Sequence, residues 1–217
     1  MFTLYGSTGS GSAAVEGALL LCGAPFRVVR ASSWEADSDQ AALLKANPLG
    51  QIPTLQLPEG GVMTESAAIL IHLGLAYPAS GLLPADLAAR AQALRGLVYV
   101  AANCYAAIGV IDFPERWCDG GDEAMHKAIR AGARRRLHQC WDAFADQFGS
   151  SEPFLGGQGP GALDLLATVV SRWSGARPHL RKHRPALHAC FERTQAHPKL
   201  AALFARHWPP PAAAGGA

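Results

Sequence analysis

The spacing of apolar residues changes near residue 80, and this change limits the folds that the chain can adopt. Before 77–84, a stretch rich in proline, glycine and serine, strand-like and helix-like segments alternate. After it, apolar residues recur every three or four positions, which is the period of amphipathic helices. A mixed half followed by a helical half favours two domains over one. We expect domains at 1–79 and 87–210, joined by a linker at 80–86.

The mixed half is expected to have the element order β-α-β-α-β-β-α. Its predicted strands are 2–5, 26–30, 54–57 and 62–63, and its predicted helices are 13–22, 41–46 and 66–76. The sequence NPLG at 47–50 predicts a turn, and PEGG at 58–61 predicts a hairpin between the last two strands.

Composition excludes several classes of partner. With a net charge of +2 and 17% charged residues, the chain has no overall electrostatic field that would attract it to nucleic acid or to an anionic membrane. The basic clusters at 134–136 and 181–184 have no interleaved aromatic residues and indicate solvated helix faces. The longest apolar run, 97–111, is broken by Asn103 and is predicted to be too short to span a membrane. Since no secretory signal is evident, we expect a cytoplasmic protein.

The cysteines and histidines predict no metal site. The five cysteines are widely spaced, without a Cys-x-x-Cys pair, and are expected to be reduced and mostly buried. His179, His183 and His188 lie close in sequence, but prolines interrupt the helix that would align them and no nearby carboxylate completes a site.

The sequence GSTGSGS at 6–12 has three possible roles: a phosphate cradle, a source of a catalytic hydroxyl, or a simple turn. Gly9, Gly11 and Ala14 match a dinucleotide-binding fingerprint between a strand and a helix. The expected ribose-binding acid is missing from the end of the second strand, which is Arg30, with Glu35 several residues farther on. A hairpin also replaces the continuing βαβ pattern. A nucleotide-dependent oxidoreductase therefore remains only an alternative.

The middle segment indicates a peptide ligand. A cis proline at Pro53 would turn the amide and carbonyl of Ile52 outward, where an extended cysteine-containing peptide can pair with them. Glu65 and Ser66 begin a helix, where an amine and a carboxylate can be held together. Glutathione offers both features, a central cysteine and a γ-glutamyl end. Each residue also has a purely structural alternative, as a strand start or a helix cap.

Two segments carry a resemblance to a known family. NPLGQIPTL at 47–55, followed by ESAAI at 65–69, resembles the N-terminal domain of the cytosolic glutathione transferases, in a bacterial, serine-type or atypical class. Phe154 and Leu155, with GALD at 161–164, resemble the helix-start element of that family's C-terminal domain. Gly161 stands where the family usually has Ser or Thr, so we expect a weaker helix nucleus in which Asp164 still satisfies amides.

The resemblance implies a fold and a set of ligand contacts. The fold is α/β plus all-α: a thioredoxin-like βαβαββα domain followed by an α-helical bundle, in a homodimer. Ile52 pairs with the cysteinyl part of glutathione beside a cis Pro53, Glu65 and Ser66 hold the γ-glutamyl group, and Gln51 is a further contact.

The implied chemistry needs a hydrogen-bond donor at the end of the first strand. A thiol with a pKa of about 8.5 is only slightly ionised at pH 7, so the site must stabilise the thiolate. The family's tyrosine register falls on Gly6, its cysteine register on Gly11 and its serine register on Ser10. We predict Ser10 as the donor, with Ser12, the expected helix N-cap, as the nearest alternative. Ser7, Thr8 and the loop amides are further alternatives.

The second substrate is expected to be a hydrophobic electrophile bound against the first helix of the second domain. Candidate residues there are Tyr99, Asn103, Tyr105 and Ile108, with Phe113 and Trp117 farther along; helix packing is the alternative role for each. The predicted function is a glutathione transferase. A non-catalytic, regulatory glutathione-binding protein of the same fold is the alternative.

Overall fold

The structure is a computed structural model that describes residues 1–149 and 152–209, and it divides into two compact units. The first unit comprises Met1–Leu82 and the C-terminal segment from Gln195, and the second comprises Leu83–Thr194. The boundary falls inside the predicted linker. The segment from Gln195 groups with the first unit. Residue 210, the predicted end of the second domain, lies outside the described residues.

The first unit has the predicted βαβαββα order. Its strands are β1 (Phe2–Gly6), β2 (Phe26–Arg30), β3 (Thr54–Gln56) and β4 (Val62–Met63), arranged in the order β2-β1-β3-β4. β1 runs parallel to β2 and antiparallel to β3, and β3 pairs with β4 as the predicted hairpin. This antiparallel hairpin is not the continuing parallel sheet of a dinucleotide-binding domain, so the nucleotide alternative loses its support.

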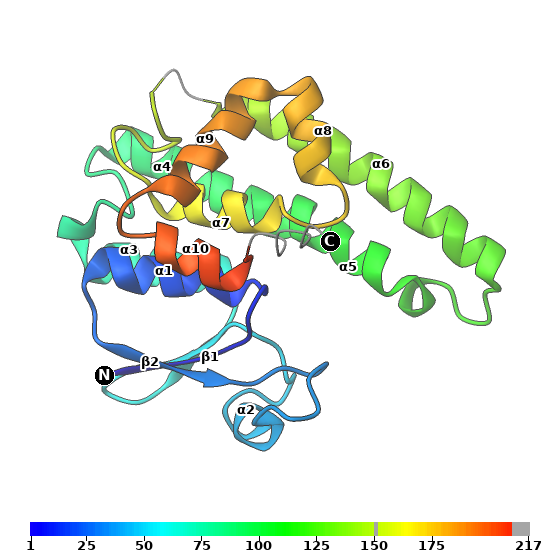
Figure 1. Cartoon of the computed structure of the whole chain (residues 1–217), viewed down its shortest axis with the longest axis horizontal. Coiled ribbons are helices and arrows are strands. Elements are labelled where there is room, and N and C mark those ends of the chain that lie inside the picture. Colours follow the sequence, from blue (N-terminus) through cyan, green and yellow to red (C-terminus); the bar gives the residue numbers. More distant parts are fainter. Residues whose placement is uncertain (150–151, 210–217) are drawn as a thin grey trace, which may run out of the picture. The chain divides into compact units, whose positions relative to one another are not determined.

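Helices cover both faces of this sheet. α1 (Ser12–Cys22) and α3 (Ser66–Ala76) contact each other on one face, and α2 (Gln40–Ala46) lies on the other face against β3 (Figure 1). The short η1 (Pro78–Ser80) follows α3, and α10 (Ala201–His207) packs on α1. The central strands β1 and β3 and the helices α1 and α3 contribute fully buried side chains to the core of this unit: Leu4, Val15, Leu19, Leu55, Ile69, Leu70 and Leu73. This apolar layer fixes the sheet on which the candidate site is built.

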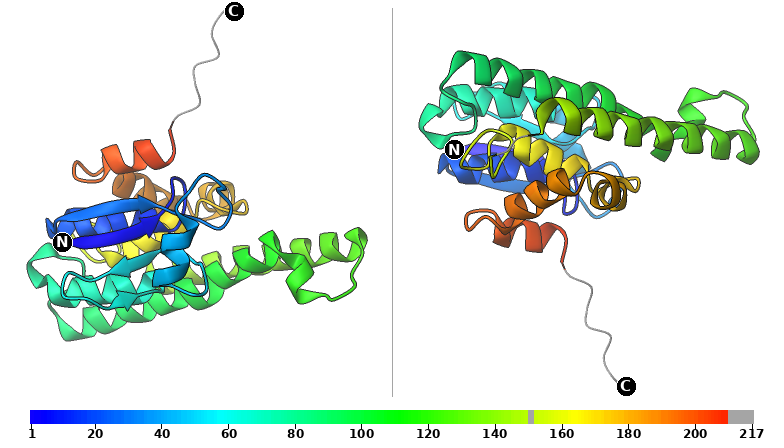
Figure 2. Two further views of the ribbon diagram at one scale, coloured as in Figure 1. Left: turned by 90° about the horizontal axis from the view of Figure 1, so that it is seen from below. Right: turned by 90° about the horizontal axis from the view of Figure 1, so that it is seen from above.

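The second unit is helical, as predicted. Its elements are α4 (Leu87–Tyr99), the π-helical η2 (Val100–Tyr105), α5 (Ala106–Asp112), η3 (Pro114–Trp117), α6 (Glu123–Phe148), α7 (Ala162–Val170), α8 (Ala176–His183) and α9 (Pro185–Ala196). α6 runs alongside α4 and α5 (Figure 2). Trp141 and Phe144 of α6 are fully buried, which confirms that the apolar stripe of this long helix faces a core.

The first three elements of this unit form one long helical stretch, Leu87–Asp112, which is long and apolar enough to cross a membrane by length and composition alone. This stretch contains the apolar run 97–111 and extends it at its N-terminal side. A core helix meets the same criteria, and this stretch packs against α6 and α7.

Asp164 has the predicted capping role at the start of α7. Its Oδ2 accepts the Gly161 amide at 2.9 Å and its Oδ1 accepts the Leu155 amide at 2.8 Å. The carboxyl is fully buried, and this burial raises its pKa, although the amide hydrogen bonds oppose the shift. Asp164 thus supplies the cap interaction that Gly161, without a side chain, does not.

Candidate functional site

Strand register brings the predicted glutathione-binding residues to one edge of the sheet. β1 pairs with β3 through Tyr5 and Thr54, and β3 pairs with β4 through Leu55 and Met63. The segment after β1, the segment before β3 and the segment after β4 therefore lie at the same edge. The loop after β2 joins them, since the Ala31 amide donates to the Gly6 carbonyl at 2.9 Å.

The serine loop between β1 and α1 is organised around the carbonyl of Ser7. That oxygen lies 2.7 Å from the hydroxyl oxygen of Ser10 and 3.2 Å from that of Ser12. The two hydroxyl oxygens lie 2.7 Å apart, and all three serines are buried, whereas Thr8 is exposed. Because each hydroxyl has one proton, one of this pair donates to the other and the acceptor of the two donates to Ser7.

Ser12 is not the cap of α1 as predicted. Gly11 occupies the N-cap position without a side-chain bond, and Ser12 is the first helical residue. Its hydroxyl instead turns back to accept the Ser7 amide at 3.3 Å. A side chain at Gly6 would not fit beside it, because a Cβ there would lie 2.6 Å from the Ser12 Cβ. Gly6, which occupies the position of the family's tyrosine, therefore has no room for a side chain in this loop conformation.

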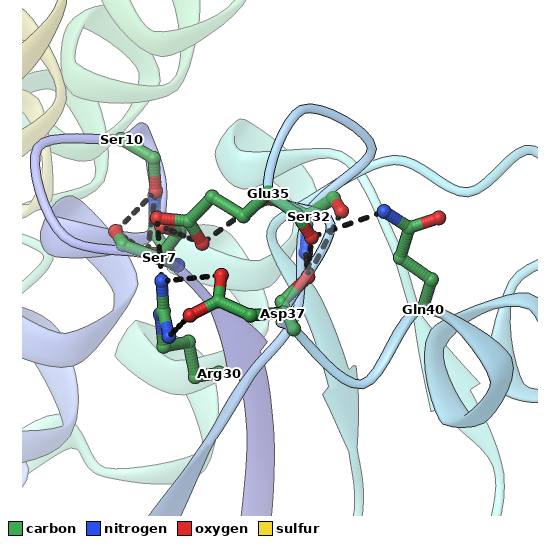
Figure 3. Close-up of polar contacts among 9 residues, drawn as sticks. Ser7, Ser10, Arg30, Ser32, Glu35, Asp37 and Gln40 are labelled. Carbon is green, nitrogen blue, oxygen red and sulfur yellow. Dashed lines mark hydrogen bonds and ion pairs between the residues drawn. The ribbon is translucent and has the colours of Figure 1, made fainter.

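Glu35 is a site residue that the sequence analysis considered only as a ribose ligand. Its Oε2 accepts the hydroxyl of Ser7 at 2.7 Å and that of Ser32 at 2.9 Å, and the Arg30 guanidinium lies 3.4 Å from Oε1 (Figure 3). The Ser7 hydroxyl, helped by Ser32 and Arg30 and opposed by desolvation, lowers the pKa of the Glu35 carboxyl. Arg30 is itself held by both carboxylate oxygens of Asp37.

The turn before β3 is held by Asn47. Its amide nitrogen donates to the Gln51 carbonyl and to the Thr54 hydroxyl, both at 3.1 Å, and its Oδ1 accepts the Leu49 amide. The expected cis peptide between Ile52 and Pro53 is confirmed. Gln51 is exposed and Ile52 half-buried. Ile52 precedes the β1–β3 ladder, which begins at Thr54, so its backbone is not engaged there.

The start of α3 places Glu65 in an unusual conformation. Glu65 has φ 62° and ψ 107°, outside the regions that a residue with a Cβ normally occupies, and its side chain is exposed and makes no cap bond. Ser66 is the first residue of α3 and is half-buried. Backbone strain of this kind concentrates at ligand-binding positions, where surrounding structure maintains it.

A second contact to the serine loop comes from α10 and was not predicted. The Gly9 amide donates to Nδ1 of His207 at 3.1 Å, and Nε2 of His207 lies 3.0 Å from Oε2 of Glu16. Nδ1 is therefore an acceptor, and the proton is assigned to Nε2. Arg206 pairs with the other oxygen of Glu16. Burial tends to raise the pKa of Glu16, but the bonds from His207 and Arg206 outweigh it and lower that pKa.

The residues proposed for the second substrate belong to the second unit. The Tyr99 hydroxyl donates to the Cys140 carbonyl at 3.0 Å, its ring packs against Phe144 and Phe148, and burial raises its pKa to about 12. Tyr99 is therefore a packing residue.

The other three candidates differ in their surroundings. Asn103, in the π-helical turn, donates to the Tyr99 carbonyl. The rings of Tyr105 and Trp173 make an edge-to-face contact, with their centroids 5.8 Å apart, and Ile108 is buried. Phe113 and Trp117 are both exposed. The side-chain amide of Asn103, which lies within an apolar run, is thus hydrogen-bonded to its own helix.

Comparison with known proteins identifies the family. Residues 12–75 match the model of the glutathione S-transferase N-terminal domain. A maleylacetoacetate isomerase from Pseudomonas aeruginosa is 33% identical over 172 residues, covering 73% of this chain and 76% of that protein. The uncharacterized GST-like protein YncG of Escherichia coli K12 is 29% identical over 208 residues, covering 95% and 98%. The chain belongs to the cytosolic-type glutathione S-transferase family.

The fold agrees with this assignment. A glutathione transferase homologue from Sulfitobacter, solved with bound glutathione, superimposes with a TM-score of 0.82 at 24% identity, over 94% of this chain and 96% of that one. A thioredoxin-like domain followed by an all-helical domain is therefore the architecture of this chain, as the sequence predicted.

Proposed function

We propose that this protein is a glutathione transferase that binds glutathione at the described sheet edge and transfers its thiolate to a hydrophobic electrophile. One observation carries the proposal: strand register puts the Ile52 backbone, which lies outside the β1–β3 ladder, a strained Glu65 at a helix N-terminus and a hydroxyl-rich loop at the same edge. An extended cysteinyl peptide with an adjacent amine and carboxylate matches the first two features. We further propose Gln51 and Ser66 as contacts and the cytoplasm as the location.

Ser10 is the proposed donor to the thiolate sulfur. Its hydroxyl can leave the Ser7 carbonyl without stranding a buried acceptor, because that carbonyl also accepts from the Ser12 hydroxyl and the Ser10 amide. A hydrogen bond to a charged acceptor contributes about 1.5–3 kcal/mol. Ser10→Ala should therefore lower kcat/KM by on the order of 10- to 100-fold.

The test measures two quantities separately. Binding of glutathione is followed by calorimetry, and conjugation is followed with a panel of aryl halides and activated alkenes. Ser10→Ala should show this decrease in kcat/KM and retain binding, and Thr8→Ala, at an exposed hydroxyl of the same loop, is the matched control. A protein that neither binds glutathione nor conjugates any electrophile contradicts the proposal.

The second candidate is a non-catalytic glutathione-binding protein. The observation that favours it is the closed hydrogen-bond network of the loop, in which the protons of Ser7, Ser10 and Ser12 all have protein acceptors. Glutathione binding without turnover, unchanged by Ser10→Ala, would support this candidate over the enzyme. Light scattering on the purified chain tests the homodimer that we propose in either case.

A further inference from the structure

Two sulfur atoms and an imidazole nitrogen lie near one another at the turn between η3 and α6, in the second unit. The Sγ of Cys118 is in contact with the Sδ of Met125. The Nε2 of His126 is buried and has no hydrogen-bond partner among residues 1–149 and 152–209. A Cβ built on Gly121 would lie 3.0 Å from the thiol sulfur and 3.1 Å from this nitrogen. The thiol and the imidazole therefore line the same small space over Gly121.

The backbone holds these three side chains in place. The Gly121 amide donates to the Cys118 carbonyl at 3.2 Å and closes the turn. Asp122 caps α6: its Oδ1 accepts the Met125 amide at 2.8 Å and its carbonyl accepts the His126 amide at 3.0 Å. The backbone that carries the three side chains is thus held by hydrogen bonds over nine residues. A bound ligand therefore has to order mainly the side chains, which lowers the entropy cost of binding.

The ligand atoms of the cluster indicate which metal ion it would bind. Thiolate and thioether sulfurs are soft ligands that prefer Cu(I), and imidazole also coordinates copper. Within the described chain no group of three or more His, Cys, Asp or Glu side chains is placed to hold a metal ion, so the ligand set for Zn(II) is not assembled. Methionine is the residue that completes this cluster. We infer that Cys118, Met125 and His126 form a binding site for a soft monovalent cation, with Cu(I) as the matching ion.

Binding at this site needs no change of oxidation state. The Cys118 thiol releases its proton to water, and the thiolate sulfur, the Met125 sulfur and the His126 nitrogen each donate a lone pair to the ion. Cys118 and His126 are half-buried and Met125 is about half exposed, so the ion has access from solvent. The exposed Met125 side chain is free to move away from Cys118 and admit the ion between the two sulfurs.

This cluster contains neither a cysteine pair nor a group of histidines, so no sequence motif marks it. The remaining cysteines provide an internal comparison. Cys104, Cys140 and Cys190 are buried, and burial raises the pKa of the Cys190 thiol to about 12. Cys22 is half-buried, and burial also raises the pKa of its thiol. Cys22 is therefore the thiol that a soft ion would reach next.

The test titrates the reduced, full-length protein with Cu(I) under anaerobic conditions, in competition with a chromogenic Cu(I) chelator. Wild type and Cys22→Ser should each bind one Cu(I) per chain, and Cys118→Ser should lose it. Met125→Leu and His126→Gln should each weaken binding by at least about tenfold, equivalent to about 1.4 kcal/mol. Retention of the Cu(I) by Cys118→Ser, or equal affinity of wild type and a Met125→Leu/His126→Gln double variant, overturns the site.

Gly121→Ala is the sharpest variant, because it removes no ligand. The added methyl group would fill the space between the thiol and the imidazole and should weaken Cu(I) binding by at least about tenfold. Gly109→Ala on α5, where an added Cβ meets nothing within 4 Å, is the matched control and should bind as wild type. Wild-type affinity in Gly121→Ala contradicts the inference. Glutathione binding and the circular dichroism spectrum should be unchanged in these variants, which separates this site from the proposed function.

Discussion

Replacement of His207 by leucine tests whether α10 holds the serine loop in place. His207 is only 6% exposed and makes two hydrogen bonds, one from the Gly9 amide and one to the Glu16 carboxylate. A neutral hydrogen bond contributes about 0.5–1.5 kcal/mol and one to a charged group about 1.5–3 kcal/mol. We expect His207→Leu to lower the free energy of unfolding of the first unit by about 2–4 kcal/mol.

Hydrogen exchange separates the local effect from the global one. Loss of the Gly9 bond alone, at about 1 kcal/mol, should speed opening of residues 7–12 about fivefold. Mass spectrometry of peptides from this loop and from α10 measures the change, at a denaturant concentration where the protein stays folded. The kcat/KM for conjugation should fall in parallel, because the loop carries the proposed donor.

Two further variants make this prediction refutable. Glutamine at 207 offers one acceptor and one donor, so His207→Gln should recover part of the protection. His72→Leu changes a half-buried histidine of α3 in the same unit and should leave exchange of the loop unchanged. Unchanged exchange of residues 7–12 in a folded His207→Leu protein, or an equal increase in His72→Leu, would refute the proposed contact.

Three other perturbations follow from the geometry of the site. Gly6→Ala puts a methyl group 2.6 Å from the Ser12 Cβ, so it should destabilise the protein by about 1–3 kcal/mol, measured as a lower Tm. Asn47→Ala removes three hydrogen bonds of a buried side chain; calorimetry should show weaker glutathione binding, and urea unfolding a loss of about 2–3 kcal/mol. Glu16→Gln should change the pH dependence of stability. Because the Glu16 pKa is lowered from 4.5, its stabilisation is present above that pH and is lost as the pH falls through the folded-state pKa. The stability difference between wild type and Glu16→Gln should therefore shrink on acidification in urea titrations, and a constant difference would contradict the pairing.

The fold was predictable because its signals are local. Turns rich in proline and glycine separate short segments with a clear period, and the β3–β4 hairpin follows from PEGG at 58–61. The cis Pro53 and the helix start at Ser66 were also predicted, since each depends on a few consecutive residues. Their juxtaposition depends on strand register, which the sequence suggested only through the family resemblance.

The missed residues contact the site across long sequence separations. Glu35 bonds a serine 28 positions earlier, and His207 bonds a glycine 198 positions earlier. Neither has a neighbouring motif that marks it. The ring of Tyr99 packs against Phe144 and Phe148, which is the alternative role given for it, and the spacing of apolar residues alone does not show against which neighbours such a ring packs. Long-range packing is the information that local patterns lack.

The most distinctive polar residue of the middle segment, Asn47, acts on the chain itself. Its side-chain hydrogen bonds go to the turn that presents Ile52 and to Thr54 at the start of β3, and Glu65 is distinguished by its backbone torsion angles. In the proposed function, recognition of a peptide at this edge depends mainly on backbone groups, which many side chains can support. The chemistry depends instead on which hydroxyl proton the serine loop can release. Ser10 and Ser12 share one acceptor, so removal of either hydroxyl reassigns the proton of the other. Single and double variants of Ser10 and Ser12 should consequently give non-additive losses in kcat/KM, and additive losses would mean that the two hydroxyls act independently.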